Sequence, residues 1–107
     1  MKILKLKDYT RGWFIGNFEP SLLKTDQFEI SVQHYKKNEF VQPHTHKIST
    51  EYNVLISGLM TIQGKDLKAG DIFILEPNEI TDPVYHEECT IVIIKIPCVI
   101  GDKYDIF

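Results

Sequence analysis

The sequence predicts an all-β fold, a small sandwich or barrel of antiparallel strands. Apolar residues recur at every second position far more often than at helical spacing. The apolar runs are rich in β-branched side chains, which strands favour. Turn-forming residues separate these runs at regular intervals, and short strands joined by regular turns are typical of sandwiches and barrels.

Five strands are predicted in order along the chain. The first, FEISVQHYK (28–36), alternates Phe28, Ile30 and Val32 with polar residues, as a half-buried strand does. His34 continues the apolar side of this alternation, so we expect it to be a hydrogen-bonded interior residue rather than a ligand. The other predicted strands are EYNVLIS (51–57), LMTIQ (59–63), DIFILE (71–76) and CTIVIIKIP (89–97).

Residues that favour turns lie between these strands. Glycine supplies the positive φ and proline the fixed φ that tight turns require. One helical turn is expected near residues 20–25, where Pro20 suits the first position of a short helix. No internal repeat or linker is visible, so the 107 residues are expected to form one domain, 1–107. The predicted turns are Gly58, QGKD (63–66), KAGD (68–71), EPNE (76–79) and TDP (81–83).

Composition and charge narrow the classes of partner. The chain has 15 acidic and 12 basic residues, a net charge of -3, and its scattered lysines form no basic stripe for a phosphate backbone. The N-terminal apolar residues are interrupted by lysines, unlike a signal peptide, and no stretch approaches the length of a membrane span. Cys89 and Cys98 form no CxxC motif, which favours reduced thiols. We therefore expect a cytoplasmic protein with no nucleic-acid or membrane partner.

The stretch PHTHKISTE contains a candidate metal site. His44 and His46 are two residues apart, so on a strand their side chains point the same way. Glu51 follows at an odd spacing, and a bend through KIST must bring it to the same side. Two imidazoles and a carboxylate suit a first-row divalent metal such as Fe, Mn, Zn or Ni, with positions left open for substrate. The alternative is that both histidines are exposed polar residues of a loop.

This spacing resembles the first motif of the cupins, G-x5-HxH-x3,4-E-x6-G. The histidines, Glu51 and Gly58 match it, and Asn38 stands in place of its first glycine. The second cupin motif, G-x5-P-x-G-x2-H-x3-N, is half kept in GDIFILEPNEITDPVYH, where one extra residue separates the glycine from the proline. Its positions are occupied by Gly70, Pro77, Glu79 for the second glycine, Asp82 for the histidine and His86 for the asparagine.

The resemblance covers about residues 28–97 and implies an antiparallel cupin β-barrel, a double-stranded β-helix or jelly roll. It further implies a metal in the barrel mouth held by His44, His46 and Glu51. Asp82 occupies the position of the family's fourth ligand, and its carboxylate is able to coordinate a metal. The alternative for Asp82 is a turn residue in TDP. His86 is a second candidate for the fourth ligand.

We expect a cupin that binds a divalent metal and a small polar or anionic molecule. Metal-dependent oxygenases and isomerases are both represented in the family, and the metal would act as a Lewis acid or activate oxygen or water. One alternative is a non-catalytic sensor module. Another is a metal-free epimerase or isomerase of nucleotide-linked sugars with histidine as general base and tyrosine as acid. That alternative predicts a basic pocket, for which Lys47 and Arg11 are candidates.

A homodimer is also expected. Cupins are often dimers, and a barrel of this size has edges and apolar terminal segments that need covering against open-edge pairing. We expect the contact to run through the N-terminal segment or the outer sheet.

Overall fold

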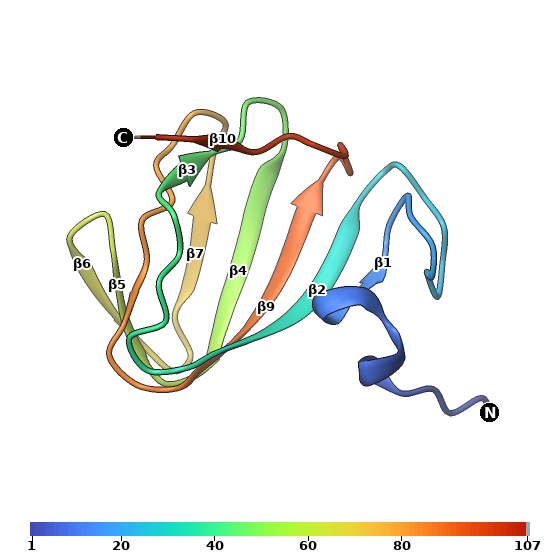
Figure 1. Ribbon diagram of the computed structural model, residues 1–107, viewed down its shortest axis with the longest axis horizontal. Coiled ribbons are helices and arrows are strands. Elements are labelled where there is room, and N and C mark those ends of the chain that lie inside the picture. Colours follow the sequence, from blue (N-terminus) through green and yellow to red (C-terminus); the bar gives the residue numbers. More distant parts are fainter. Residues whose placement is uncertain (107) are drawn as a thin grey trace.

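Two layers of β-structure make up the part of the chain described by the computed structural model, residues 1–106 (Figure 1). The larger layer is a five-stranded antiparallel sheet in the order β1-β2-β9-β4-β7. Its strands are β1 (Trp13–Ile15), β2 (Glu29–Tyr35), β9 (Cys89–Ile96), β4 (Thr50–Ser57) and β7 (Ile72–Leu75). The all-β antiparallel architecture predicted from the sequence is confirmed.

Two small antiparallel sheets complete the fold. The three-stranded sheet contains β6 (Lys65–Lys68), β5 (Leu59–Ile62) and β8 (Val84–Tyr85). The two-stranded sheet pairs β3 (His44–Thr45) with β10 (Tyr104–Asp105), so the C-terminal segment runs beside the histidine motif (Figure 1).

The five predicted strands are present as β2, β4, β5, β7 and β9, each within one residue of its expected ends. The predicted helical turn near residues 20–25 is wrong. Its backbone pairs with β1 instead, since Gly16 N donates to Leu23 O at 3.3 Å and Leu23 forms a bridge with Ile15. The helical turns are 3₁₀ segments at Leu6–Asp8 and Thr10–Gly12. Within residues 1–106, no helix has the length and apolar character needed to cross a membrane.

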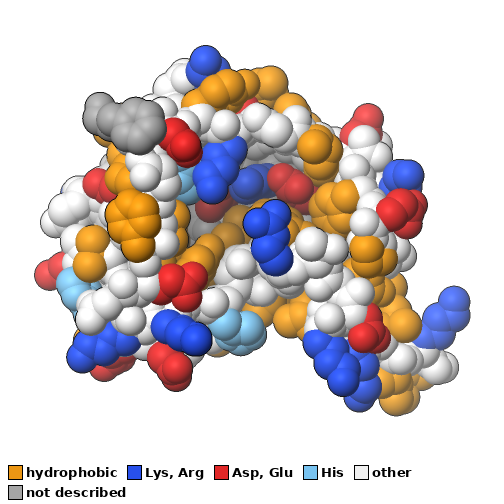
Figure 2. Space-filling view, in the orientation of Figure 1, with side chains coloured by type: hydrophobic (Ala, Val, Ile, Leu, Met, Phe, Trp, Pro, Cys, Tyr) orange, Lys and Arg blue, Asp and Glu red, His pale blue; other side chains and the backbone are white. Residues whose placement is uncertain are grey.

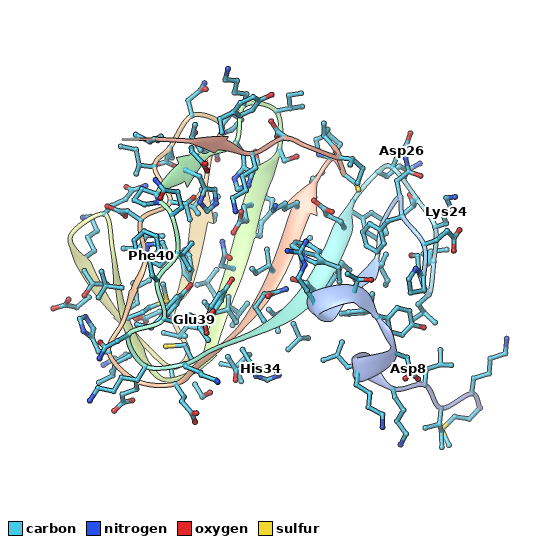
Figure 3. The ribbon with its side chains drawn as sticks, in the orientation of Figure 1. Asp8, Lys24, Asp26, His34, Glu39 and Phe40 are labelled. Atoms are coloured by element: carbon cyan, nitrogen blue, oxygen red, sulfur yellow. The ribbon has the colours of Figure 1, made fainter. Side chains whose placement is uncertain are left out.

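Strand β2 turns polar residues inward and apolar residues outward, the reverse of the usual pattern for a half-buried strand. Glu29 and Ser31 are buried on the inner face, whereas Ile30 and Val32 lie on the outer face opposite the apolar side chains of β9. His34 shares the outer parity and is exposed near the end of the sheet (Figure 3). Its Nδ1 lies 3.0 Å from Thr90 Oγ1. The predicted hydrogen bond is therefore present, but the predicted interior position of His34 is wrong.

The apolar core fills one end of the inner face. The buried core cluster consists of Leu55, Met60, Ile62, Leu75, Tyr85, Cys89, Ile91 and Ile93. Tyr35 stacks on Tyr85 with ring centroids 4.4 Å apart. Toward the other end of the same face the residues become polar, and Glu29, Lys95 and Glu51 stand side by side on β2, β9 and β4. The core thus closes one end of the barrel and leaves a polar, open end for a site.

Candidate functional site

A cavity of about 750 Å³ opens at the polar end of the barrel. Figure 2 shows the hollow, with basic and acidic side chains at its mouth and walls. The inner face of the five-stranded sheet forms one wall, the segment around β3 another, and the C-terminal segment before β10 a third. The polar residues that line it include His44, His46, Glu29, Glu51, Asn53, Lys95, Asp102 and Lys103.

His44 and His46 are buried side by side in this cavity. Their ring centroids are 5.1 Å apart and the rings are perpendicular. Backbone bonds fix His44, because its N–H donates to Thr81 O at 3.1 Å and its carbonyl accepts from Thr81 N at 2.8 Å. His44 Nδ1 lies 2.8 Å from the carbonyl oxygen of Gln42. A carbonyl only accepts, so Nδ1 carries the proton and Nε2 has the free lone pair.

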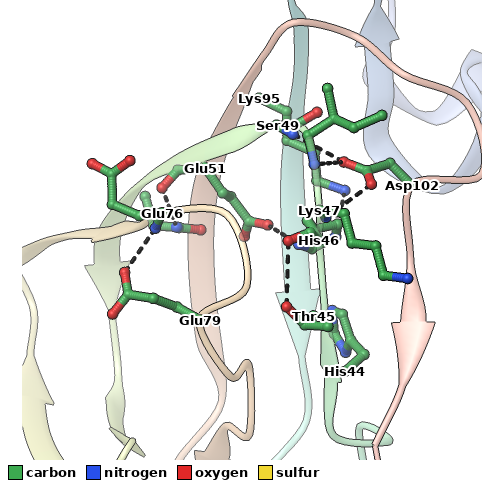
Figure 4. Close-up of polar contacts among 12 residues, drawn as sticks. His44, Thr45, His46, Lys47, Ser49, Glu51, Glu76, Glu79, Lys95 and Asp102 are labelled. Atoms are coloured by element: carbon green, nitrogen blue, oxygen red, sulfur yellow. Dashed lines mark hydrogen bonds and ion pairs between the residues drawn. The ribbon is translucent and has the colours of Figure 1, made fainter.

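The bend between His46 and Glu51 is held by Asp102 (Figure 4). The Asp102 carboxylate accepts the backbone N–H groups of Lys47, Ile48 and Ser49 at 2.9, 3.1 and 2.9 Å. The turn brings Glu51 back into the cavity, where its Oε2 lies 3.5 Å from His46 Nδ1. The sequence required such a bend, but nothing in it marked Asp102 as the residue that makes it.

Lys95 is the central charge of the site, and sequence analysis missed it. In the sheet register Lys95 stands between Glu29 on β2 and Glu51 on β4. Its Nζ lies 3.3 Å from His46 Nε2 and 3.9 Å from Glu29 Oε1, and 5.1 Å from the centre of the Trp13 ring. One signal was available: Lys95 is the only charge inside CTIVIIKIP and shares the inward parity of the core residues of that strand.

Burial and Lys95 together set the protonation of the site. Burial, followed by the nearby Lys95 charge, lowers the pKa of His46 to about 4, and burial also lowers the pKa of His44. Both imidazoles are therefore neutral at neutral pH. Burial raises the pKa of Glu51 and of Glu29, and in both cases Lys95 opposes the rise. Because His46 Nε2 faces an ammonium donor, the neutral ring carries its proton on Nδ1, toward Glu51.

Asp102 has the opposite shift. Burial disfavours its charge, but the three backbone N–H groups outweigh this, so the pKa of Asp102 is lowered. The carboxylate is charged and fully engaged with the bend.

The arrangement of donors does not fit a metal ion. Both ring nitrogens of His46 already face other groups, Glu51 at Nδ1 and Lys95 at Nε2. Across residues 1–106, no three His, Cys, Asp or Glu side chains gather in a way that could hold one. An ammonium group beside His46 Nε2 would also repel a divalent cation placed there. The metal role of His44, His46 and Glu51 stays a prediction.

Asp82 and His86, the candidates for a fourth ligand, do not line the cavity. Asp82 Oδ1 accepts the backbone N–H of Gln63 at 2.8 Å, a contact that fits the turn alternative. Its neighbours Thr81 and Pro83 line the cavity, so alternation along this extended segment turns Asp82 away. His86 is exposed, with Nε2 2.7 Å from Thr61 Oγ1.

The basic residues around the cavity differ in part from those expected. Arg11 lines the cavity as anticipated, together with Lys95 and Lys103. Lys47 does not line it, and its Nζ lies 4.1 Å from the centre of the Tyr104 ring.

Comparison with known proteins gives a clear answer for the fold. No family model matches the sequence, and no curated protein matches it. A solved structure of an uncharacterized protein with a double-stranded β-helix domain from Klebsiella pneumoniae matches with a TM-score of 0.68. It is 22% identical, over 94% of this chain and 88% of that chain. A cupin-2 domain protein from Shewanella frigidimarina matches with a TM-score of 0.55 and 22% identity, over 67% of this chain and 72% of that chain. The chain has the cupin fold.

Another cupin-fold neighbour is the nucleoside dehydratase Pac13. It matches with a TM-score of 0.63 and 14% identity, over 77% of this chain and 70% of that chain. Sequence identities this low establish the fold and leave the chemistry to the site itself.

The cupin fold also accounts for two positions of the first motif. Asn38, in place of the first glycine, has φ 62°, a conformation that asparagine tolerates better than most residues. Gly58, the last glycine, has φ 101°, and a Cβ there would collide with Glu88 O and Cys89 Sγ. Only glycine fits at position 58, whereas asparagine is able to adopt the positive φ that position 38 requires.

Proposed function

We propose that the cavity binds a small anionic molecule and that the protein moves a proton on it, as a metal-independent isomerase or epimerase does. The observation that carries this proposal is the buried chain of contacts Glu51, His46, Lys95 and Glu29, which leads from a carboxylate through an imidazole to an ammonium group. Such a chain provides a base and a cation side by side. A cupin-fold neighbour named as a dehydratase supports acid-base chemistry in this type of barrel.

His46 is the general base in this proposal. The contact of Nδ1 with Glu51 orients the ring and directs the basic lone pair of Nε2 toward the cavity. The pKa of about 4 means that the ring is almost entirely in its basic form at neutral pH. In the free protein the Lys95 ammonium contacts this lone pair at 3.3 Å. When the ligand enters, the ammonium must leave His46 Nε2 and pair with the bound anion instead.

The reaction is a proton shift next to a carbonyl group. His46 takes a proton from the carbon beside the carbonyl, and the electron pair of that C–H bond moves onto the carbonyl oxygen. The Lys95 ammonium stabilises the resulting enolate. If the carbon that loses its proton carries a hydroxyl group, the hydroxyl proton shifts to the enolate oxygen and the carbon-bound proton returns to the former carbonyl carbon, which gives an isomer. Return of a proton to the opposite face of the original carbon gives an epimer. The step needs no other reactant.

The lining of the cavity favours a ligand with an anionic group. The carboxylates that line the cavity are each already engaged. Glu29 and Glu51 flank Lys95 in the sheet, and Asp102 is bound to the backbone of the bend. Glu19 Oε1 lies 3.2 Å from Lys24 Nζ, and Glu39 accepts the backbone N–H of Lys36. Arg11 and Lys103 provide further positive charge. Small keto acids and sugar phosphates carry both a carbonyl and such an anion, and the 750 Å³ cavity is large enough for either.

Exchange of carbon-bound protons with solvent tests this function. The untagged protein is incubated in deuterated buffer with a panel of keto acids and sugar phosphates, and the proton beside the carbonyl is followed by NMR. We expect a ligand of this class to lose that proton signal and His46→Gln to stop the exchange. Binding without exchange would identify a sensor module instead. No binding of any anion in the panel would contradict the proposal.

A metal-dependent cupin is the second candidate. One observation favours it: His44 keeps Nε2 free by donating Nδ1–H to Gln42 O, an arrangement common among metal-ligating histidines. His44, His46 and Glu51 would be the ligands, and Lys95 would first have to leave His46 Nε2. Elemental analysis of untagged protein for Fe, Mn, Zn and Ni separates the two candidates, since this one requires an ion bound in stoichiometric amount.

We also propose that the protein is a homodimer joined through the outer face of the five-stranded sheet. Two apolar rows cross four strands there, Ile30-Ile94-Tyr52-Ile74 and Val32-Val92-Val54-Ile72. Ile72 is 69% exposed and Ile74 is 49% exposed. A contiguous apolar surface of this kind on a folded chain indicates a contact with another protein surface. A second copy presents the same rows, so the contact is self-complementary.

A further inference from the structure

We propose that the Lys95 ammonium is the resident cation of this site and holds the place that a divalent metal would need. In this view the histidine pair and Glu51, which do not gather around one point while the lysine is in place, are a latent metal site that the lysine of the same chain keeps closed. The proposal deepens the function proposed above, which uses the same lysine, but it is tested without any substrate.

The position of Lys95 in the sheet is the first support. It stands directly between Glu29 and Glu51 in neighbouring strands, so its charge acts on both carboxyl groups and opposes the rise that burial causes in the pKa of each. Its Nζ points to His46 Nε2 at 3.3 Å and to Glu29 Oε1 at 3.9 Å, and its side chain is 18% exposed. A cation that contacts an imidazole and a carboxylate, with a second carboxyl group on the adjacent strand, has the kinds of neighbour that a metal ion has.

The occupancy of the histidine nitrogens is the second support. His46 presents Nδ1 to Glu51 and Nε2 to Lys95, which leaves no lone pair of that ring for an ion. His44 is different, because among residues 1–106 only its Nδ1 has a partner. The motif therefore contains all three potential ligands, His44, His46 and Glu51. Lys95 from β9 occupies the Nε2 lone pair of His46, the middle residue of the three.

The charge balance gives the consequence of removing the lysine. Without Lys95, the cavity wall keeps two buried carboxylates and two neutral imidazoles and loses the one cation placed among them. Buried carboxylates without a counter-charge favour uptake of a cation. The lone pair of His46 Nε2 becomes available at the same time. Replacement of Lys95 by an uncharged residue should therefore make metal binding tighter than it is in the natural protein.

The experiment compares metal binding by untagged wild type, Lys95→Met and Lys95→Arg. Each protein is titrated calorimetrically with Zn²⁺, Ni²⁺ and Mn²⁺, then dialysed and analysed for bound metal. Methionine keeps the length of the side chain without its charge, and arginine keeps the charge. We expect Lys95→Met to retain about one ion per chain, at least roughly tenfold more tightly than wild type, and Lys95→Arg to behave as wild type.

Two controls locate the effect. Lys103→Met removes another cavity lysine and should gain no metal. The double variant Lys95→Met with His46→Gln should lose the metal that the single variant gained. If Lys95→Met fails to fold by circular dichroism, Lys95→Gln replaces it, since a neutral polar residue of similar length is milder beside two carboxylates.

Two results would overturn the proposal. The first is a wild-type protein that retains stoichiometric metal which His44→Ala loses, because Lys95 would then not exclude the ion. The second is a folded Lys95→Met variant, or a folded Lys95→Gln variant where it replaces Lys95→Met, that binds no metal, because no latent site would exist. Failure of the anion-binding function is seen separately, in the NMR panel, which contains no metal.

Discussion

The two faces of the five-stranded sheet present opposite kinds of residue to opposite surroundings. The inner face buries charged and polar side chains, among them Glu29, Glu51 and Lys95, at the open end of the barrel. The outer face carries rows of isoleucine and valine that are half-buried on the central strands and exposed on β7, where Ile72 is the most exposed. A sheet selected only for the stability of a monomer would bury the isoleucine and valine side chains and expose the charged ones. The difference is the one expected if the inner face binds a ligand and the outer face contacts a second copy, as proposed above.

The inner face carries an energetic cost that the outer face does not. Buried ionisable groups are tolerated because each has a partner, and loss of one member leaves the others uncompensated. The predictions below alter one face while leaving the other intact, and they run from the largest expected effect to the smallest.

The largest effect is expected from the inner face. His46→Gln keeps the size of the side chain and removes the base, so proton exchange should fall by about 100-fold to 10,000-fold. His34→Gln is the matched control, because His34 is exposed away from the cavity (Figure 3), and it should exchange as wild type. NMR of the carbon-bound proton measures both. Full exchange by His46→Gln would place the base elsewhere.

The outer face should respond in assembly and not in chemistry. Ile74→Glu puts a charge into an apolar row, and the dimer dissociation constant should rise by about 100-fold. Sedimentation would then show the 12.4 kDa monomer at micromolar concentration. Ile3→Glu is the control, since Ile3 is an exposed apolar residue of the N-terminal segment. Dissociation by Ile3→Glu alone would move the contact to that segment, and a monomeric wild type would refute the dimer.

Substitution of Asp102 tests how far the positions of His46 and Glu51 depend on the C-terminal segment. Asp102→Asn weakens three hydrogen bonds to the bend after His46, so unfolding in urea should show a loss of about 2 kcal/mol. Anion binding should weaken too, because the bend positions His46 and Glu51. Asp105→Asn, on exposed β10, should change stability by less than about 0.5 kcal/mol. Equal effects of the two variants would show that Asp102 has no special role.

The pH dependence of stability should reveal the buried neutral imidazole. The pKa of His46 is about 4 in the folded protein and 6.5 without its environment, so between these values the unfolded chain binds more protons. Stability therefore falls as pH decreases through this window. Between neutral pH and about pH 5, wild type should lose about 2 kcal/mol more than His46→Gln, measured by urea unfolding at each pH. An identical loss in both proteins would mean that His46 is not buried in its neutral form.

The smallest effect is expected for Asp82. Its carboxylate contacts the backbone of Gln63 and does not line the cavity, so Asp82→Asn should cost less than about 1 kcal/mol and leave anion affinity unchanged. His44→Ala, within the cavity, should weaken the same binding. Calorimetry with a ligand found in the NMR panel measures both. An equal loss of anion affinity in the two variants would show that Asp82 is part of the binding site.

Local pattern was sufficient for the strands and for part of the site. Alternation and β-branched residues located β2, β4, β5, β7 and β9, because these signals depend on neighbouring residues alone. The HxH spacing and the bend before Glu51 brought three residues to one cavity, as expected. The two-residue strands β3, β8 and β10 carry no such signal, since pairing with distant segments creates them.

The amino-acid sequence by itself determined which residues share a face, because a strand repeats every two residues. Only the tertiary structure decided which face is inside, because alternation favours the apolar face but the second layer of the barrel determines which face is covered. The cupin barrel encloses Glu29 and leaves Ile30 outside, against the hydrophobic pattern. The same choice brings Lys95 from β9 to His46 on another segment, a contact across 49 residues that no local pattern contains.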